Sequence, residues 1–139
     1  MRFMTLVFSR ESSGPPPRAL MDAITQLTVD AARTGALVDT GGLLPTQAGA
    51  RVQLRRGAIK VTDGPFAEAK EVVGGFAVYE MKSKQEAIDA SVRFLELHKE
   101  HWPGWEGDVE IRQMFDAPAP APAGSASAPE RRRAADARS

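Results

Sequence analysis

The segment Phe3–Phe8 is typical of a β-strand with apolar side chains on both faces. Because side chains alternate along a strand, each face holds its own set of residues. Phe3 and Val7 lie on one face, and Met4, Leu6 and Phe8 lie on the other. A strand of this kind needs cover on both faces, and within a small domain helices are expected to cover only one. The pattern therefore predicts that a second subunit, in a homodimer, covers the other face.

Two amphipathic helices are predicted. The first runs from about Arg18 to Thr34, and Gly35 follows as its C-terminal stop. Its apolar residues at helical spacing are Leu20, Ile24, Leu27 and Ala31. The second begins at the capping-box pattern Ser83–Glu86 and runs to about His98 or His101. Its predicted buried stripe is Ile88, Val92 and Leu95, widened by Phe94 and Leu97.

Short apolar segments predict further strands at Ala36–Thr40, Gly75–Met81 and Asp108–Met114. Phe76 and Val78 are expected on one face of their strand and Ala77 and Tyr79 on the other, whereas Val109 and Ile111 point inward from the last strand.

A β-hairpin is predicted around a two-residue turn at Arg56–Gly57. In that register Leu54 pairs with Ile59 and Val52 with Val61 on one face, and Gln53 pairs with Lys60 and Arg51 with Thr62 on the other. A slip of one residue would destroy this separation of apolar and polar side chains. Asp63 then follows at the exit of the hairpin.

The order of these elements predicts an α+β domain over residues 1–116 with a ferredoxin-like arrangement and an inserted β-hairpin. Strands that are apolar on both faces predict two sheets packed together across a homodimer. From 117 to 139 the composition changes to Ala, Pro, Ser, Gly and Arg, which is typical of a disordered tail. The tail is either an unstructured appendage or, because it is mildly basic, a tether for a nucleic acid or another partner.

Charge and composition exclude several classes of function. The 139 residues hold 18 basic and 18 acidic side chains, so no net field draws the folded domain to nucleic acid or to an anionic membrane. Cysteine is absent, which excludes disulfides, thiolate nucleophiles and cysteine-bound metals and fits a reducing compartment. No segment has the apolar length of a membrane span, and the first apolar run is too short for a signal peptide. We therefore expect a cytoplasmic protein without membrane partners.

The densest group of reactive side chains follows the hairpin. Asp63–Phe66 combines turn residues with a large aromatic side chain, and Glu68, Lys70 and Glu71 follow closely. An aromatic residue in a turn needs a place to be buried. The apolar strand that starts at Gly74–Phe76 comes directly afterwards.

This motif resembles the signature of the DGPF family, a branch of the YCII-related proteins. The similarity extends from Arg2 to about Phe115 and includes Val38–Leu43 and Glu110–Arg112. The resemblance implies a dimeric α+β barrel with a cleft near the subunit boundary. YCII-type relatives are thought to use a histidine and an aspartate as an active site. Asp63 matches the aspartate, but the first histidine of this chain is His98.

Asp63 has two interpretations. Its carboxylate could face a cleft, where desolvation would suit it to proton transfer, or it could accept hydrogen bonds from the amides of its own turn. Arg51 could form an ion pair with it across the end of the hairpin, although an exposed pair contributes little. The predicted ligand-binding residues are Asp63, Gly64, Pro65, Phe66, Glu68 and Lys70.

His98 and His101 are the chain's two histidines, and their spacing places them on the same side of the second helix. They could present two imidazoles to a metal, or they could interact with the negative end of the helix dipole beside Trp102 and Trp105. No third ligand is marked in the sequence, although Glu68, Glu106 or Asp108 could approach in the fold, so the two histidines stay weak metal candidates and no cofactor is predicted.

Three functions remain open. The first is a small-molecule binding or regulatory homodimer, and the second is a cofactor-independent enzyme with Asp63 as general acid or base. The third, implied only by the family resemblance, is an accessory of transcription linked to alternative sigma factors.

Overall fold

The computed structural model describes residues 1–116, and the predicted disordered tail at 117–139 lies outside the described residues. Its strands are β1 (Arg2–Ser9), β2 (Leu37–Gly42), β3 (Ala50–Arg55), β4 (Ala58–Asp63), β5 (Val72–Glu80) and β6 (Gly107–Gln113). Its helices are α1 (Arg18–Arg33) and α2 (Lys84–His101), with short 3-10 helices η1 (Glu11–Ser13) and η2 (Thr46–Ala48) in the connections. The predicted strands and helices are present, with ends shifted by a few residues.

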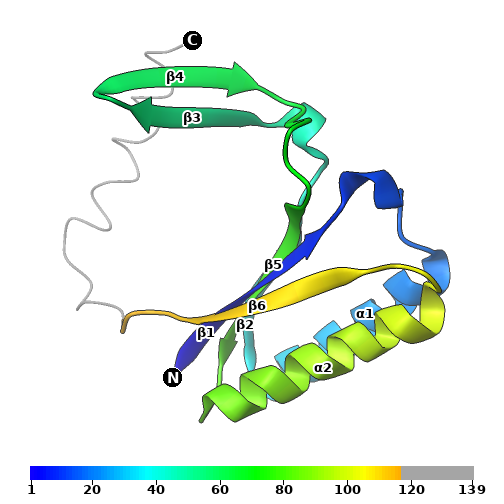
Figure 1. Ribbon diagram of the computed structural model, residues 1–139. Coiled ribbons are helices and arrows are strands. Elements are labelled where there is room, and N and C mark those ends of the chain that lie inside the picture. The colour runs from blue at the N-terminus through cyan, green and yellow to red at the C-terminus, as the bar shows by residue number, and fades with distance from the viewer. Residues whose placement is uncertain (117–139) are drawn as a thin grey trace.

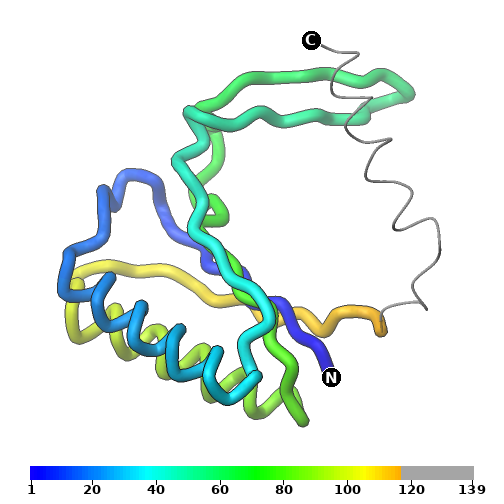
Figure 2. Tube along the Cα trace, turned by 180° about the vertical axis from the view of Figure 1, so that it is seen from behind, coloured from blue at the N-terminus to red at the C-terminus, as the bar shows by residue number. Residues whose placement is uncertain are grey.

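The central sheet has four strands in the order β2-β5-β1-β6, and every neighbouring pair is antiparallel. Both helices lie on one side of this sheet in the two opposite views (Figures 1 and 2). This strand order and this placement of the helices confirm the predicted α+β class and are compatible with a ferredoxin-like fold.

The two faces of the sheet differ in what covers them. Phe3, Thr5 and Val7 belong to the face toward the helices, and Thr5 and Val7 line the same space as Leu20 and Phe94 of the helices. The opposite face, here called the uncovered face, carries Met4, Leu6, Phe8, Val73, Phe76 and Val78 on its two central strands, as the pairing of β1 with β5 shows. The pairing of β1 with β6 places Asp108, Glu110 and Arg112 on the same face, along its edge strand. This division confirms the predicted faces of both strands. Neither α1 nor α2 lies on the uncovered face.

Each helix turns its small and apolar residues toward the sheet. Leu20 of α1 is completely buried, as the predicted stripe requires. The side chain of Ser83 accepts a hydrogen bond from the amide of Glu86, which confirms the predicted cap of α2. The stripe predicted for α2 was partly wrong, because Val92 is 52% exposed. The buried positions are Ala87, Ser91, Leu97 and His98, so the helix is rotated away from Val92.

The β3–β4 hairpin forms a separate two-stranded sheet that projects away from the central sheet (Figure 1). Its observed pairs are those predicted, including Leu54 with Ile59 and Val52 with Val61. Arg56 and Gly57 both have positive φ angles, of 51° and 81°, which suits a tight hairpin turn. The four apolar side chains on its one face, Val52, Leu54, Ile59 and Val61, are each between 62% and 66% exposed.

Candidate functional site

The Asp63–Phe66 turn is tied to the rest of the domain through Thr46. The amide of Phe66 donates a hydrogen bond of 3.0 Å to Thr46 Oγ1. The hydroxyl of Thr46 donates in turn to Glu11 Oε2 at 2.9 Å, and the Thr46 amide donates to Glu11 Oε1 at 2.5 Å. A single carboxylate, at the start of η1, thus holds η2 through Thr46, and Thr46 holds the turn.

Gly64 lies so close to η2 that no side chain fits. A Cβ atom at Gly64 would lie 1.6 Å from the carbonyl oxygen of Thr46, which is far inside van der Waals contact. The amide of Gly64 also donates a hydrogen bond of 2.9 Å to the carbonyl of Gly49. The glycine of the motif therefore lets the two ends of the β3–β4 hairpin meet η2 at close range.

Arg51 joins two residues of the motif. Its guanidinium forms an ion pair with Glu68 and lies 4.2 Å from the centre of the Phe66 ring. The considered ion pair of Arg51 with Asp63 is not observed, because Arg51 is directed to Glu68. A hydrogen bond from the backbone, and then the hydrogen bond from Arg51, lower the pKa of Glu68 below its ordinary value.

A cleft of about 610 Å³ lies between this turn and the edge of the central sheet. Its lining residues are Phe8, Gly42–Thr46, Ala48–Arg51, Phe66, Ala69 and Glu71–Val73. The floor is apolar, and Arg51 and Glu71 are the charged residues of the lining. A cleft of this size and composition suits a small organic molecule with an apolar body.

The predicted site residues divide into those at the cleft and those outside it. Phe66 lines the cleft, and Glu68 is connected to it through Arg51. Asp63 is exposed at the end of β4, outside the lining, as are Pro65 and Lys70, and Gly64 is outside the lining too. Within the described residues, Asp63 forms no side-chain hydrogen bond, and the nearby amides of Gly64 and Phe66 donate to other groups.

The two histidines lie in different surroundings. His98 is 6% exposed, its Nδ1 lies 3.0 Å from the carbonyl oxygen of Phe94, and its ring packs between Phe94 and Trp105. Burial lowers the pKa of His98, and the hydrogen bond to Phe94 opposes this only in part. His101 is only partly buried, and its Nε2 lies 3.9 Å from Oε2 of Glu100. Among residues 1–116, no three His, Cys, Asp or Glu side chains are grouped as metal ligands.

Sequence reasoning missed Glu11 and Thr46, which position the turn. Thr46 follows Pro45 in a segment of turn residues, and a hydroxyl there is a signal for local hydrogen bonding. Glu11 had no such signal, because its partner is 35 residues away in the sequence.

Neither helix of the described residues is long and apolar enough to cross a membrane.

Comparison with known proteins shows a family and a relative to which the chain is similar. The model of the YCII-related domain matches residues 1–93. An uncharacterized protein of Rhizobium meliloti (strain 1021) is 35% identical over 86 residues, which cover 62% of this chain and 66% of that protein, just under two thirds of its length. The family match includes β1, α1, the hairpin, the Asp63–Phe66 turn and half of α2. The chain therefore belongs to the YCII-related domain family.

Proposed function

We propose that this protein is a homodimer that binds a small organic molecule in the cleft beside the Asp63–Lys70 segment, in a regulatory or other non-catalytic role. The observation that carries the proposal is the continuity of the cleft with the uncovered face. Phe8 and Val73 are paired across β1 and β5 on that face, and both line the cleft. A second subunit on the uncovered face would therefore also border the bound molecule.

The uncovered face supports a contact between two sheets. The side chains of its two central strands are apolar, and Leu6, Phe8 and Phe76 are only partly buried within one chain, whereas Asp108, Glu110 and Arg112 of β6 form a charged edge. Two sheets pack with their apolar faces about 10 Å apart, and this removes such side chains from water. The exposed apolar face of the hairpin adds area of the same kind, which a second copy can cover.

The cleft defines the chemistry of the ligand. Phe8 and Phe66 supply apolar surface for the body of a molecule, and Arg51 and Glu71 supply a donor and an acceptor for its polar groups. Arg51 is already held by Glu68 and Phe66, so its position is fixed before a ligand arrives. Such preorganisation reduces the entropy lost on binding.

One observation favours a second candidate function, a cofactor-independent enzyme. The amides of Gly64 and Phe66 donate to Gly49 and Thr46. The carboxylate of Asp63 is therefore not occupied by its own turn and is free to act as a general acid or base on a molecule that reaches it from the cleft, whose lining does not include Asp63.

Sedimentation equilibrium tests the dimer. The native chain should have twice the mass of one chain at micromolar concentration, and Leu6→Glu should give the mass of one chain because it places a charge on the uncovered face. Gln85→Glu, an equal charge change on the exposed side of α2, should leave the dimer intact. Circular dichroism checks that both variants keep their helices. A native protein with the mass of a single chain would refute the dimer.

Thermal shift with a set of small metabolites tests the cleft. A compound that raises the melting temperature of the native protein should lose this effect in Phe66→Ala, which removes part of the cleft wall. If the compound is bound but not converted, the binding role is supported. If the native protein converts it and Asp63→Asn does not, the enzyme replaces the binding role.

A further inference from the structure

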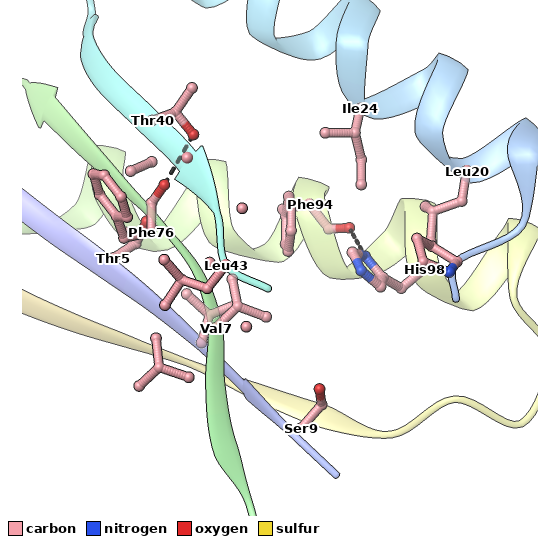
Figure 3. A pocket seen from close by; sticks show the side chains of 18 of the residues that line it. Thr5, Val7, Ser9, Leu20, Ile24, Thr40, Leu43, Phe76, Phe94 and His98 are labelled. Atoms are coloured by element: carbon pink, nitrogen blue, oxygen red, sulfur yellow. Dashed lines mark hydrogen bonds between the residues drawn. The ribbon is translucent and has the colours of Figure 1, made fainter. Parts of the chain in front are cut away.

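A second hollow lies between the central sheet and the two helices (Figure 3). This interlayer cavity measures about 530 Å³, within the usual range for sites that bind small molecules. It meets the cleft only at the shared rim around Gly42–Pro45 and Val72–Val73. Its walls come instead from Thr5 and Val7 of β1 and from the inner sides of α1 and α2.

The cavity exists because the sheet carries small side chains beneath the helices. Thr5 pairs with Ala77 and Val7 pairs with Gly75, and all four residues line the cavity. Leu20, Ile24 and Phe94 approach from the helices, as Figure 3 shows, but Gly75 and Ala77 of β5 are too small to meet them. The space between the layers is therefore left unfilled.

His98 presents an unused hydrogen-bond acceptor to this cavity. Its Nδ1 lies against the Phe94 carbonyl, which can only accept, so the proton is assigned to Nδ1 and the lone pair to Nε2. Within residues 1–116, Nε2 has no hydrogen-bond partner. In the same residues, every side-chain nitrogen or oxygen atom that is fully buried does have a partner. Nε2 is therefore accessible to solvent, although His98 as a whole is only 6% exposed. Because His98 lines the cavity, the cavity is where a ligand can reach this atom.

A second buried polar group lines the same space. Thr5 is 5% exposed, and its hydroxyl also has no side-chain hydrogen bond among the described residues. The charged side chains of the lining are Arg10 and Glu11, which are exposed and belong to the rim. An ionised ligand would have no opposite charge inside the cavity, so the interior suits a neutral molecule.

We propose that the interlayer cavity binds a neutral, largely apolar small molecule that donates one hydrogen bond to Nε2 of His98, as a phenolic hydroxyl does. Phe94 and Trp105 fix the imidazole between them, with ring centres 4.5 and 4.3 Å from that of His98. The acceptor is therefore preorganised. This site is separate from the cleft of the proposed function, and it does not require a second subunit.

Binding of p-cresol to the full chain tests the hydrogen bond, with toluene as the matched probe that lacks the hydroxyl. Nuclear magnetic resonance of the His98 ring and the fluorescence of Trp105 report on the site. We expect saturable binding of p-cresol and about fivefold to tenfold weaker binding of toluene, the effect of one hydrogen bond. In His98→Phe the two probes should bind equally. Equal binding to the native protein, or no saturable binding of p-cresol up to its solubility limit, would overturn the proposal.

Cavity filling tests the location. Ala77→Leu should abolish binding of p-cresol and leave the melting temperature unchanged or higher, because the added atoms enter empty space. Ala58→Leu, on the exposed hairpin, is the matched control and should bind p-cresol normally. Phe66→Ala, in the cleft, should also bind it normally. A large fall in melting temperature with Ala77→Leu, or loss of p-cresol binding in Phe66→Ala alone, would contradict the cavity and leave the cleft proposal standing.

Discussion

Strand β1 and the β3–β4 hairpin are both rich in apolar side chains, yet those side chains differ in burial. Phe3 of β1 is 1% exposed, whereas Val61 of β4 is 65% exposed. In both regions the alternation determines which side chains share a face. Whether that face is buried depends on which other elements pack against it, and neither α1 nor α2 lies beside the hairpin (Figure 1). The alternation of side chains along a strand therefore predicts its register, but not which element packs against its apolar face.

Truncating one residue in each region should give the largest difference. Phe3→Ala should lower the free energy of unfolding by about 3–5 kcal/mol, because it leaves a cavity in the core. Val61→Ala should change it by less than about 0.5 kcal/mol, as expected of an exposed position. Urea denaturation of both variants in the Leu6→Glu background, which we expect to be monomeric, measures this. A cost for Val61→Ala that approaches that of Phe3→Ala would mean that the hairpin face is covered within one chain.

The close contact of Gly64 with Thr46, at the base of the hairpin, should be the next most sensitive to substitution. Gly64→Ala should destabilise the protein by about 1–3 kcal/mol, because the new methyl group forces the Thr46 carbonyl to move. Gly49→Ala is the matched control, since its Cβ would lie 3.5 Å from the same carbonyl oxygen. Hydrogen exchange should show that the amide of Phe66 loses protection in Gly64→Ala and keeps it in Gly49→Ala. Equal protection in both variants would contradict the close approach.

Much of the fold could be predicted because it depends on local patterns. The hairpin register followed from the position of Arg56–Gly57, and the cap of α2 followed from Ser83. The exposure of Val92 could not be predicted, because the rotation of a helix with apolar residues on several sides is decided by the sheet beneath it. The prediction that Asp63 binds a ligand stays a prediction.

The site depended more on distant contacts. Phe66 was identified from its position in a turn, since an aromatic side chain there needs burial, and it lines the cleft. Glu11 and the partner of Arg51 were not identified, because hydrogen bonds between remote segments leave no local pattern. The interlayer cavity was not predicted either, since the sequence indicates small residues but not the distance between layers.

The stability of the region between the central sheet and the helices should depend on pH through His98. Its pKa is lowered in the folded protein from an ordinary value of 6.5. As the pH falls below 6.5, this histidine therefore takes up a proton in the unfolded chain before it does so in the folded protein. The free energy of unfolding should therefore fall as the pH decreases from about 6.5 toward the lowered pKa, and remain level above 6.5. His98→Phe should reduce this slope. Urea denaturation at a series of pH values measures it, and an unchanged slope in the variant would mean that another group causes it.

The segment that follows the hairpin should show the smallest effect of pH on stability, through Glu68. Its pKa is lowered mainly by a backbone hydrogen bond and secondly by Arg51, so Arg51→Ala should return the pKa only part of the way to its ordinary value. A carboxylate with a lowered pKa stabilises the fold above its ordinary pKa, and this contribution is lost as the pH falls through the lowered value. Because Glu68 is exposed, solvent screens the ion pair and the change in stability should be small. Resonance titration of the Glu68 carboxyl group in the native protein and in Arg51→Ala measures the shift directly. A complete return to the ordinary pKa would assign the whole effect to Arg51, whereas the partial return expected here means that the backbone of the turn itself holds the carboxylate.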